Sequence, residues 1–149
     1  MKELDMERFK DTGLFIGLMG ILRESELADP SKVPDKLKIA LQKYEETMHG
    51  AAYFDFTSIM RRALFHLQTD AKFQEKIGKQ LKYLVVDEFQ DVNPMQEGIV
   101  SELYRLGANV CVVGDDDQTI FQWRGSDVSY IQDFRQRYQN VEYIKLEDN

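Results

Sequence analysis

The chain has 149 residues, 43% of them hydrophobic and 30% charged, so it can bury one ordinary core and has the composition of a globular protein. Its formal net charge of −7 argues against a uniformly basic nucleic-acid-binding surface, but the charge is unevenly distributed. Residues 51–84 carry six basic and three acidic side chains, whereas residues 85–127 carry nine acidic and two basic ones. Carboxylates that meet in this acidic segment would need a cation or a basic partner.

Cysteine usage and hydropathy argue against a secreted or membrane protein. Cys111 is the only cysteine, so no internal disulfide can form and a reducing, cytoplasmic location is predicted. The longest apolar stretch, residues 14–22, is too short to cross a bilayer and follows acidic residues instead of a basic leader. Cys111, His49 and His66 have no zinc-ligand spacing. We therefore expect no membrane partner.

The first half of the chain is predicted to be helical. Cap residues and apolar side chains recurring at helical spacing define the expected helices. These are one or two helices in residues 4–24, one from Ser31 and Pro34 to Gly50, one capped by Asp55 and apolar through Leu67, and a lysine-rich one in residues 70–79.

The second half alternates strands and helices, which predicts a parallel, doubly wound sheet. Ligands of such sheets bind beyond the carboxyl ends of the strands. Strands are expected near residues 82–87, 109–114 and 141–146. The intervening helices are expected from Asn93, with Pro94 and a Gln96 capping box, to Gly107, and from Asp127 to about Tyr138.

The most informative motif is Asp87-Glu88-Phe89-Gln90-Asp91, which follows the apolar run at residues 83–86. A β-branched run that ends in paired acids is typical of a buried parallel strand. In nucleotide hydrolases the first acid at such a place holds Mg²⁺ and the second polarises the attacking water. Gln90 and Asp91 extend and support the motif. If Asp87 and Glu88 stood alone, solvated acids at a strand end would be the better interpretation.

A second motif follows at the spacing of one strand–helix–strand unit. It reads Val-Gly-Asp-Asp-Asp-Gln-Thr-Ile-Phe-Gln-Trp-Arg-Gly-Ser-Asp over residues 113–127. The two motifs together resemble the second and third motifs of the UvrD/Rep-like superfamily 1 DNA helicases, RecA-like motors that unwind DNA with ATP. The resemblance is specific over about residues 80–128. It extends more weakly to Tyr-Phe-Asp-Phe at residues 53–56 and Leu-Glu-Asp-Asn at residues 146–149.

The resemblance implies an ATP site built from both motifs. Asp87 is implied to hold Mg²⁺, and Glu88 to activate the water that attacks ATP. Gln118 resembles the glutamine that senses the γ-phosphate, a task that suits a neutral amide because it can donate or accept. Asp115 is placed in the same polar cluster. A loop-capping amide is the alternative for Gln118, and Asp116 and Asp117 are expected to be turn residues.

The resemblance also implies a DNA-contacting loop at Phe121, Trp123 and Arg124. Aromatic side chains stack on any base, which suits a motor that does not read sequence, and an arginine can pair with a phosphate or with an acid such as Asp127. Ordinary core packing is the alternative for Trp123 and is equally favoured for Phe121. The segment at residues 53–56 either lines the DNA path or, as the preferred interpretation, caps and packs the following helix.

The implied fold class is α/β, a partial RecA-like (P-loop NTPase) parallel sheet with flanking helices, preceded by a helical segment. Residues 1–52 are expected to be the helical part of the insert of the first motor domain, and residues 53–149 the partial motor domain with the second and third motifs. The family's phosphate loop, Gly-x-x-x-x-Gly-Lys-Thr, does not occur in the sequence. We therefore expect a helicase fragment whose isolated chain does not hydrolyse ATP.

The leading hypothesis is a fragment of an ATP-dependent DNA helicase or translocase that acts in repair, replication or recombination. Its expected partners are single-stranded DNA and DNA junctions, with ATP and Mg²⁺ as cofactors. The alternatives are a helicase–nuclease subunit of the same family and a non-catalytic DNA- or protein-binding remnant. A response-regulator-like receiver also places acids at strand ends, but the Gln-Asp extension and the Gln-Trp-Arg-Gly loop argue against it.

Overall fold

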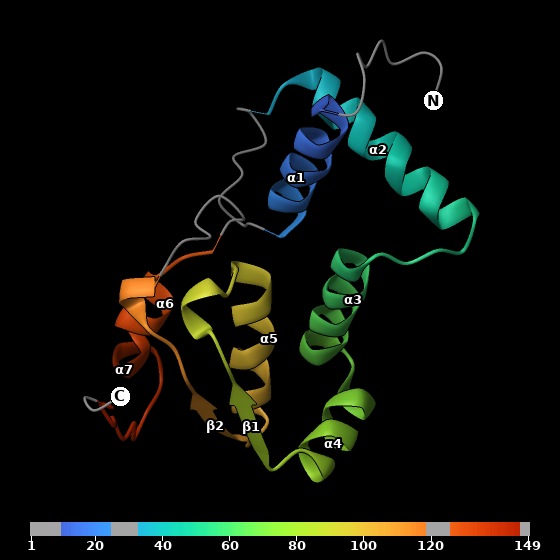
Figure 1. Cartoon of the computed structure of the whole chain (residues 1–149). Coiled ribbons are helices and arrows are strands. Elements are labelled where there is room, and N and C mark those ends of the chain that lie inside the picture. The colour runs from blue at the N-terminus through green and yellow to red at the C-terminus, as the bar shows by residue number, and fades with distance from the viewer. Residues whose placement is uncertain (1–9, 25–32, 119–125, 147–149) are drawn as a thin grey trace.

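The computed structural model describes residues 10–24, 33–118 and 126–146 (Figure 1). Helices α1 and α2 lie together at one end of the molecule, and the strands, with α5 beside them, lie toward the other end. The elements are α1 (Lys10–Glu24), α2 (Asp35–Gly50), α3 (Phe56–Thr69), α4 (Ala71–Gln80), β1 (Tyr83–Val86), η2 (Phe89–Asp91), α5 (Pro94–Arg105), β2 (Asn109–Val112), η3 (Asp116–Gln118), α6 (Ser129–Gln132) and α7 (Phe134–Arg137).

The helix caps follow the sequence closely. Asp55 caps α3 by accepting a hydrogen bond of 2.7 Å from the Ser58 backbone N–H. Asn93 and Gln96 form the predicted reciprocal capping box at the start of α5, with Pro94 in its first turn. These side chains satisfy backbone donors that have no partner inside the helix. The predicted start of α2, with a cap at Ser31 and Pro34 in the first turn, is wrong: α2 begins at Asp35 and Pro34 is its N-cap, with no side-chain cap. Ser31 itself lies outside the described residues.

β1 and β2 pair in parallel, with Val86 opposite Val112. The chain between them forms α5, so the predicted strand–helix–strand unit is confirmed. The result, over the described residues, is a mostly helical fold with a small two-stranded parallel sheet.

Two predicted elements are wrong. Residues 141–146 form no strand, and Ile144 and Leu146 in this segment are exposed. A strand is held by hydrogen bonds to a neighbour, and none of the described strands pairs with this segment, so its apolar pattern is insufficient. The single helix expected from Asp127 to Tyr138 is instead divided at Asp133 into α6 and α7. The division leaves Phe134 and Tyr138 stacked in the core, with ring centroids 4.3 Å apart.

The core lies on one face of the sheet. Alternate side chains of both strands pack there against a buried cluster contributed by η2, α5 and α7. The opposite face of β1 is open, since Tyr83 and Val85 are 77% and 69% exposed. The core cluster consists of Phe89, Val92, Val100, Phe134 and Tyr138, with Leu84, Val86, Val110 and Val112 from the strands. None of the helices in the described ranges is long and apolar enough to cross a membrane.

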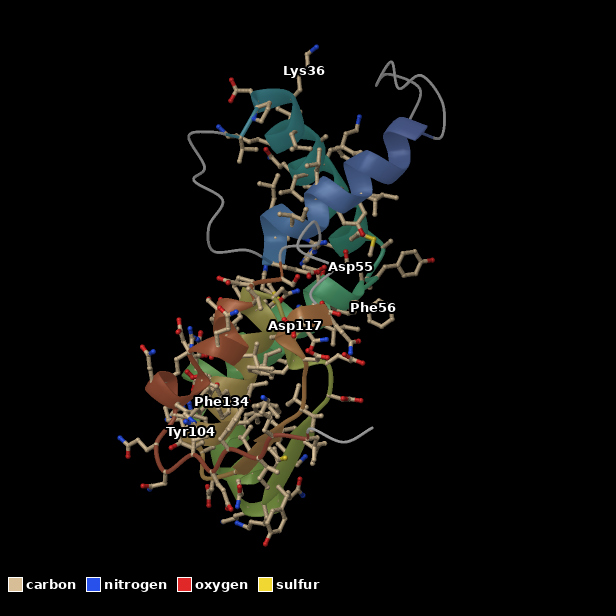
Figure 2. All side chains as sticks on the ribbon, turned by 60° about the vertical axis from the view of Figure 1, so that its left-hand side comes forward. Lys36, Asp55, Phe56, Tyr104, Asp117 and Phe134 are labelled. Atoms are coloured by element: carbon tan, nitrogen blue, oxygen red, sulfur yellow. The ribbon has the colours of Figure 1, made fainter. Side chains whose placement is uncertain are left out.

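The last turn of α1 joins the N-terminal helices to the rest of the fold. The Arg23 guanidinium donates to the Asp55 carboxylate at 2.6 Å, and Tyr44 of α2 donates to the same carboxylate at 2.7 Å. Glu24 accepts from the Asn93 side chain at 2.6 Å and from the Thr57 hydroxyl. Figure 2 shows Asp55 at this junction. Arg23 and Glu24, two consecutive residues of α1, therefore connect α1 to the starts of α3 and α5.

Candidate functional site

The register of the sheet brings the two acidic motifs together. Backbone hydrogen bonds continue past the strand ends, from Val113 N to Val86 O at 2.8 Å and from Phe89 N to Val113 O at 2.9 Å. Asp87 and Gly114 therefore follow neighbouring strands at the same edge. This is where the sequence places a ligand site, because parallel strands present their carboxyl ends together.

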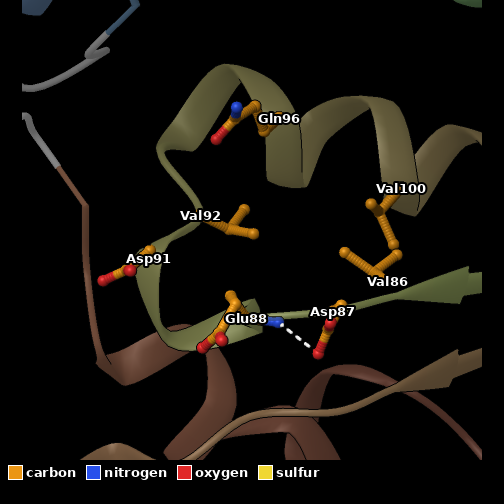
Figure 3. Close-up of a pocket in the computed structure, with 7 residues that line it drawn as sticks. All are labelled: Val86, Asp87, Glu88, Asp91, Val92, Gln96 and Val100. Carbon is orange, nitrogen blue, oxygen red and sulfur yellow. Dashed lines mark hydrogen bonds between the residues drawn. The ribbon is translucent and has the colours of Figure 1, made fainter. Parts of the chain in front are cut away.

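The turn after β1 has an unusual backbone. Glu88 has φ +52° and ψ +43°, in the left-handed region that a non-glycine residue seldom adopts. Its N–H donates to the Asp87 carboxylate at 3.0 Å, which helps to hold the turn. A pocket of about 290 Å³ opens beside this turn (Figure 3). Its lining residues are Val86, Asp87, Glu88, Asp91, Val92, Gln96 and Val100.

Among the described residues, the carboxylates of this pocket have no positively charged partner. No ion pair within the described residues involves Asp87, Glu88 or Asp91, and one buried oxygen of Asp91 has no hydrogen-bond partner there. In the part of the chain that the structure describes, no group of three or more acidic, histidine or cysteine side chains could hold a metal by itself. Mg²⁺ needs only one or two carboxylates, because water and phosphate oxygens complete its shell. The residues present therefore fit a nucleotide-bound Mg²⁺.

The second motif adds an amide to the same edge. The Gln118 amide nitrogen donates to the Asp115 carboxylate at 2.7 Å, and the Asp117 backbone N–H donates to the other oxygen at 3.0 Å. Asp115 and Gln118 are therefore in direct contact, and Asp116 and Asp117, expected in a turn, lie in the short 3₁₀ helix η3. Gln90 of the first motif is buried and bonds both the Glu88 side chain and the Asp115 backbone N–H, so the two motifs are connected through it.

The predicted DNA-contacting residues Phe121, Trp123 and Arg124 lie outside the described residues. Ser126 is buried, and the Asp127 N–H donates to the carbonyl of Val92 at 3.3 Å. Residues 126 and 127 therefore lie beside the end of the first motif.

The aromatic segment before α3 is only partly a cap. Asp55 caps the helix as expected, but the Phe56 side chain is 86% exposed and projects outward (Figure 2). Tyr53 and Phe54 are also exposed, and the Arg62 guanidinium lies 4.5 Å from the centroid of the Phe54 ring. The prediction that this segment packs against its helix is therefore confirmed for Phe54, which contacts Arg62 of α3, and is wrong for Phe56. A separate open depression of about 390 Å³ on α3 lacks the motif residues.

One contact that the sequence does not predict joins α1 to the helix that follows the first motif. Glu24 of α1 reaches Asn93, which caps the helix directly after residues 87–91. The only sequence signal was the Arg23-Glu24 pair at the end of an apolar helix, and such pairs are common on solvated helix faces.

Residues 19–139 match the model of the UvrD/REP helicase N-terminal domain. The chain is 37% identical over 109 residues to the putative ATP-dependent DNA helicase YjcD of Bacillus subtilis, and 33% identical over 106 residues to the ATP-dependent DNA helicase PcrA of the same organism. It is 31% identical over 108 residues to the ATP-dependent DNA helicase Rep of Buchnera aphidicola. These matches cover 72%, 71% and 72% of the chain, but the chain spans only 14%, 14% and 17% of the respective relatives.

Proposed function

The chain belongs to the UvrD/REP helicase family, and we propose that it is a segment of an ATP-dependent DNA helicase that contributes the water-activating half of the ATP site. The observation that carries this proposal is the shared sheet edge. At this edge, the turn of Asp87 and Glu88 lies next to the loop of Asp115 and Gln118. Among the described residues, Asp87 and Glu88 have no positively charged partner and line an open pocket.

The proposed roles follow from charge and exposure. Glu88 is exposed and can accept a proton from a water molecule at the pocket, as a general base. Asp87 would hold Mg²⁺, which when bound with ATP neutralises charge on the phosphates. Gln118 is exposed at the same edge and can donate its amide to a phosphate oxygen.

Substitution of Glu88 by glutamine in the full-length helicase tests the proposal. The change keeps the size of the side chain but removes its basicity. We expect DNA-stimulated ATP hydrolysis to fall at least about a hundredfold, within the usual contribution of a general base, while ATP binding persists. Glu75→Gln on the exposed face of α4 is the matched control and should leave hydrolysis unchanged. Turnover near the wild-type rate in Glu88→Gln would refute the role.

Single-stranded DNA is the proposed second ligand. The exposed rings of Tyr53, Phe54 and Phe56 support it, since base–aromatic stacking is independent of sequence. Phe121, Trp123 and Arg124 are proposed to act at the same ligand. Trp123→Ala should lower DNA-stimulated ATP hydrolysis and unwinding more than basal hydrolysis, which separate rate measurements with and without DNA would detect. Equal losses in all three rates would indicate a packing role.

A further inference from the structure

The Gln90 side chain is a buried amide between the two motifs. It is 1% exposed, although glutamine is usually a surface residue. Its nitrogen donates to the Glu88 carboxylate at 2.6 Å, and its oxygen accepts from the Asp115 backbone N–H at 3.1 Å. If the amide were reversed, its NH₂ group would face the Asp115 N–H and its oxygen would face the Glu88 carboxylate. These two partners therefore fix the orientation of the amide.

The second motif passes unusually close to this amide. A Cβ atom added at Gly114 would lie 2.5 Å from the Gln90 side-chain oxygen and 2.7 Å from a terminal methyl of Ile131. Only glycine fits without a shift of the surrounding atoms. The loop of the second motif therefore packs directly against the Gln90 side chain.

The contacts continue through Asp115 to the proposed phosphate sensor. The Asp115 N–H is held by Gln90, and its carboxylate accepts from the Gln118 amide at 2.7 Å. An unbroken series of hydrogen bonds thus runs from Glu88 through Gln90 and Asp115 to Gln118. A movement of the loop that carries Gln118 would displace the Asp115 N–H and with it the amide of Gln90.

Glu88 depends on this series for its side-chain orientation. Within the described residues, its carboxylate has no ion pair, and the hydrogen bond from Gln90 is its one side-chain contact of that kind. We propose that Gln90 is a positioning residue that aims the Glu88 carboxylate at the attacking water and links its position to the loop of Gln118. The inference rests on the proposed function, because it requires Glu88 to act on water.

Two substitutions of Gln90 in the full-length helicase test this link. Gln90→Met has a similar volume and loses both hydrogen bonds. Gln90→Glu keeps an acceptor for the Asp115 N–H but loses the donor to Glu88. Both should lower kcat for DNA-stimulated ATP hydrolysis about ten- to a hundredfold, the scale expected for a misplaced reacting group, while KM for ATP changes less than about threefold. Gln136→Met on α7, an exposed glutamine, is the matched control for loss of an amide.

A double-substitution measurement separates positioning from structural support. Glu88→Asp shortens the side chain so that it no longer reaches Gln90. If Gln90 acts through Glu88, adding Gln90→Met or Gln90→Glu to Glu88→Asp should reduce kcat by less than about twofold further. Hydrogen exchange at the Asp115 N–H should accelerate in Gln90→Met and stay slow in Gln90→Glu, while exchange in β1 and β2 stays slow in both.

Specific outcomes would overturn the inference. A full multiplicative loss of kcat in the Glu88→Asp background, or unchanged kcat in both Gln90 variants, shows that Gln90 does not act through Glu88. If both variants fail to fold, or exchange accelerates throughout the sheet in both, Gln90 is only structural. Wild-type turnover in Glu88→Gln would refute the proposed function itself. Loss of turnover in Glu88→Gln with normal kcat in both Gln90 variants would refute only the positioning role.

Discussion

The carboxylate of Asp55 and the carboxylates of Asp87 and Glu88 have opposite surroundings. The Asp55 carboxylate accepts hydrogen bonds from the Arg23 guanidinium at 2.6 Å and from the Tyr44 hydroxyl at 2.7 Å. Asp87 and Glu88, at the carboxyl end of β1, form no ion pair with any described residue and line an open pocket. The charge of Asp55 is compensated by Arg23, whereas Asp87 and Glu88 are available to a cation from outside the described residues.

This difference shows that the charged partners of an acid indicate whether it stabilises the fold or can bind a ligand. The hydrogen bond from Arg23 lowers the pKa of Asp55 far below its usual range, with further hydrogen bonds from Ser58 and Tyr44 in the same direction. Such an acid contributes to stability because its charged form is held in the folded state. Acids at a strand end that have no cationic partner among the described residues are the candidates for binding and catalysis.

The largest expected effect on stability is from Arg23→Ala. The Arg23 side chain is only 6% exposed, and its removal leaves Asp55, 24% exposed, without its cation. We expect a loss of ~2–4 kcal/mol in the free energy of unfolding, below the range for a fully buried pair because Asp55 is partly solvated. Urea unfolding of residues 1–149, followed by circular dichroism, measures the change.

Arg61→Ala is the matched control for this substitution. Arg23 lies 3.4 Å from the Glu45 carboxylate as well, and Arg61 pairs with the same carboxylate at 3.1 Å, but the Arg61 side chain is 56% exposed. An exposed pair contributes less than about 1 kcal/mol. Equal losses for the two arginines would contradict the distinction between the buried junction and the surface.

A smaller effect is expected from acid. The folded pKa of Asp55 is lowered, so its contribution is complete above the unfolded pKa, about 3.9, and is lost as the pH falls through the folded value. The urea midpoint should therefore drop as the pH is lowered from about 5 to below 3, because protonation breaks the contact with Arg23. Asp55→Asn should start with a lower midpoint and show a shallower decline. The same slope in both proteins would contradict the assignment.

Local signals in the sequence predicted much of the fold. The caps at Asp55 and Asn93 depend on contacts three residues along the chain, and both were predicted correctly. β1 and β2 were predicted from continuous apolar runs, and their parallel pairing from the helix between them. The strand expected at residues 141–146 failed because pairing requires a neighbouring edge, which a local pattern does not supply.

The candidate site was predictable in its residues but not in its connections. The family resemblance identified Asp87, Glu88, Asp115 and Gln118. The bond from Gln90 to Asp115 spans 25 residues, and that from Arg23 to Asp55 spans 32. Such contacts depend on how the elements pack, which a pattern in one sequence does not specify.

The most direct test of the central distinction compares Glu88→Gln with Asp55→Asn in the full-length helicase. Both changes replace a carboxylate by its amide. We expect Glu88→Gln to abolish ATP hydrolysis with little change in thermal unfolding. We expect Asp55→Asn to lower the unfolding temperature while the folded enzyme still hydrolyses ATP. Active Glu88→Gln, or a stable but inactive Asp55→Asn, would contradict this distinction.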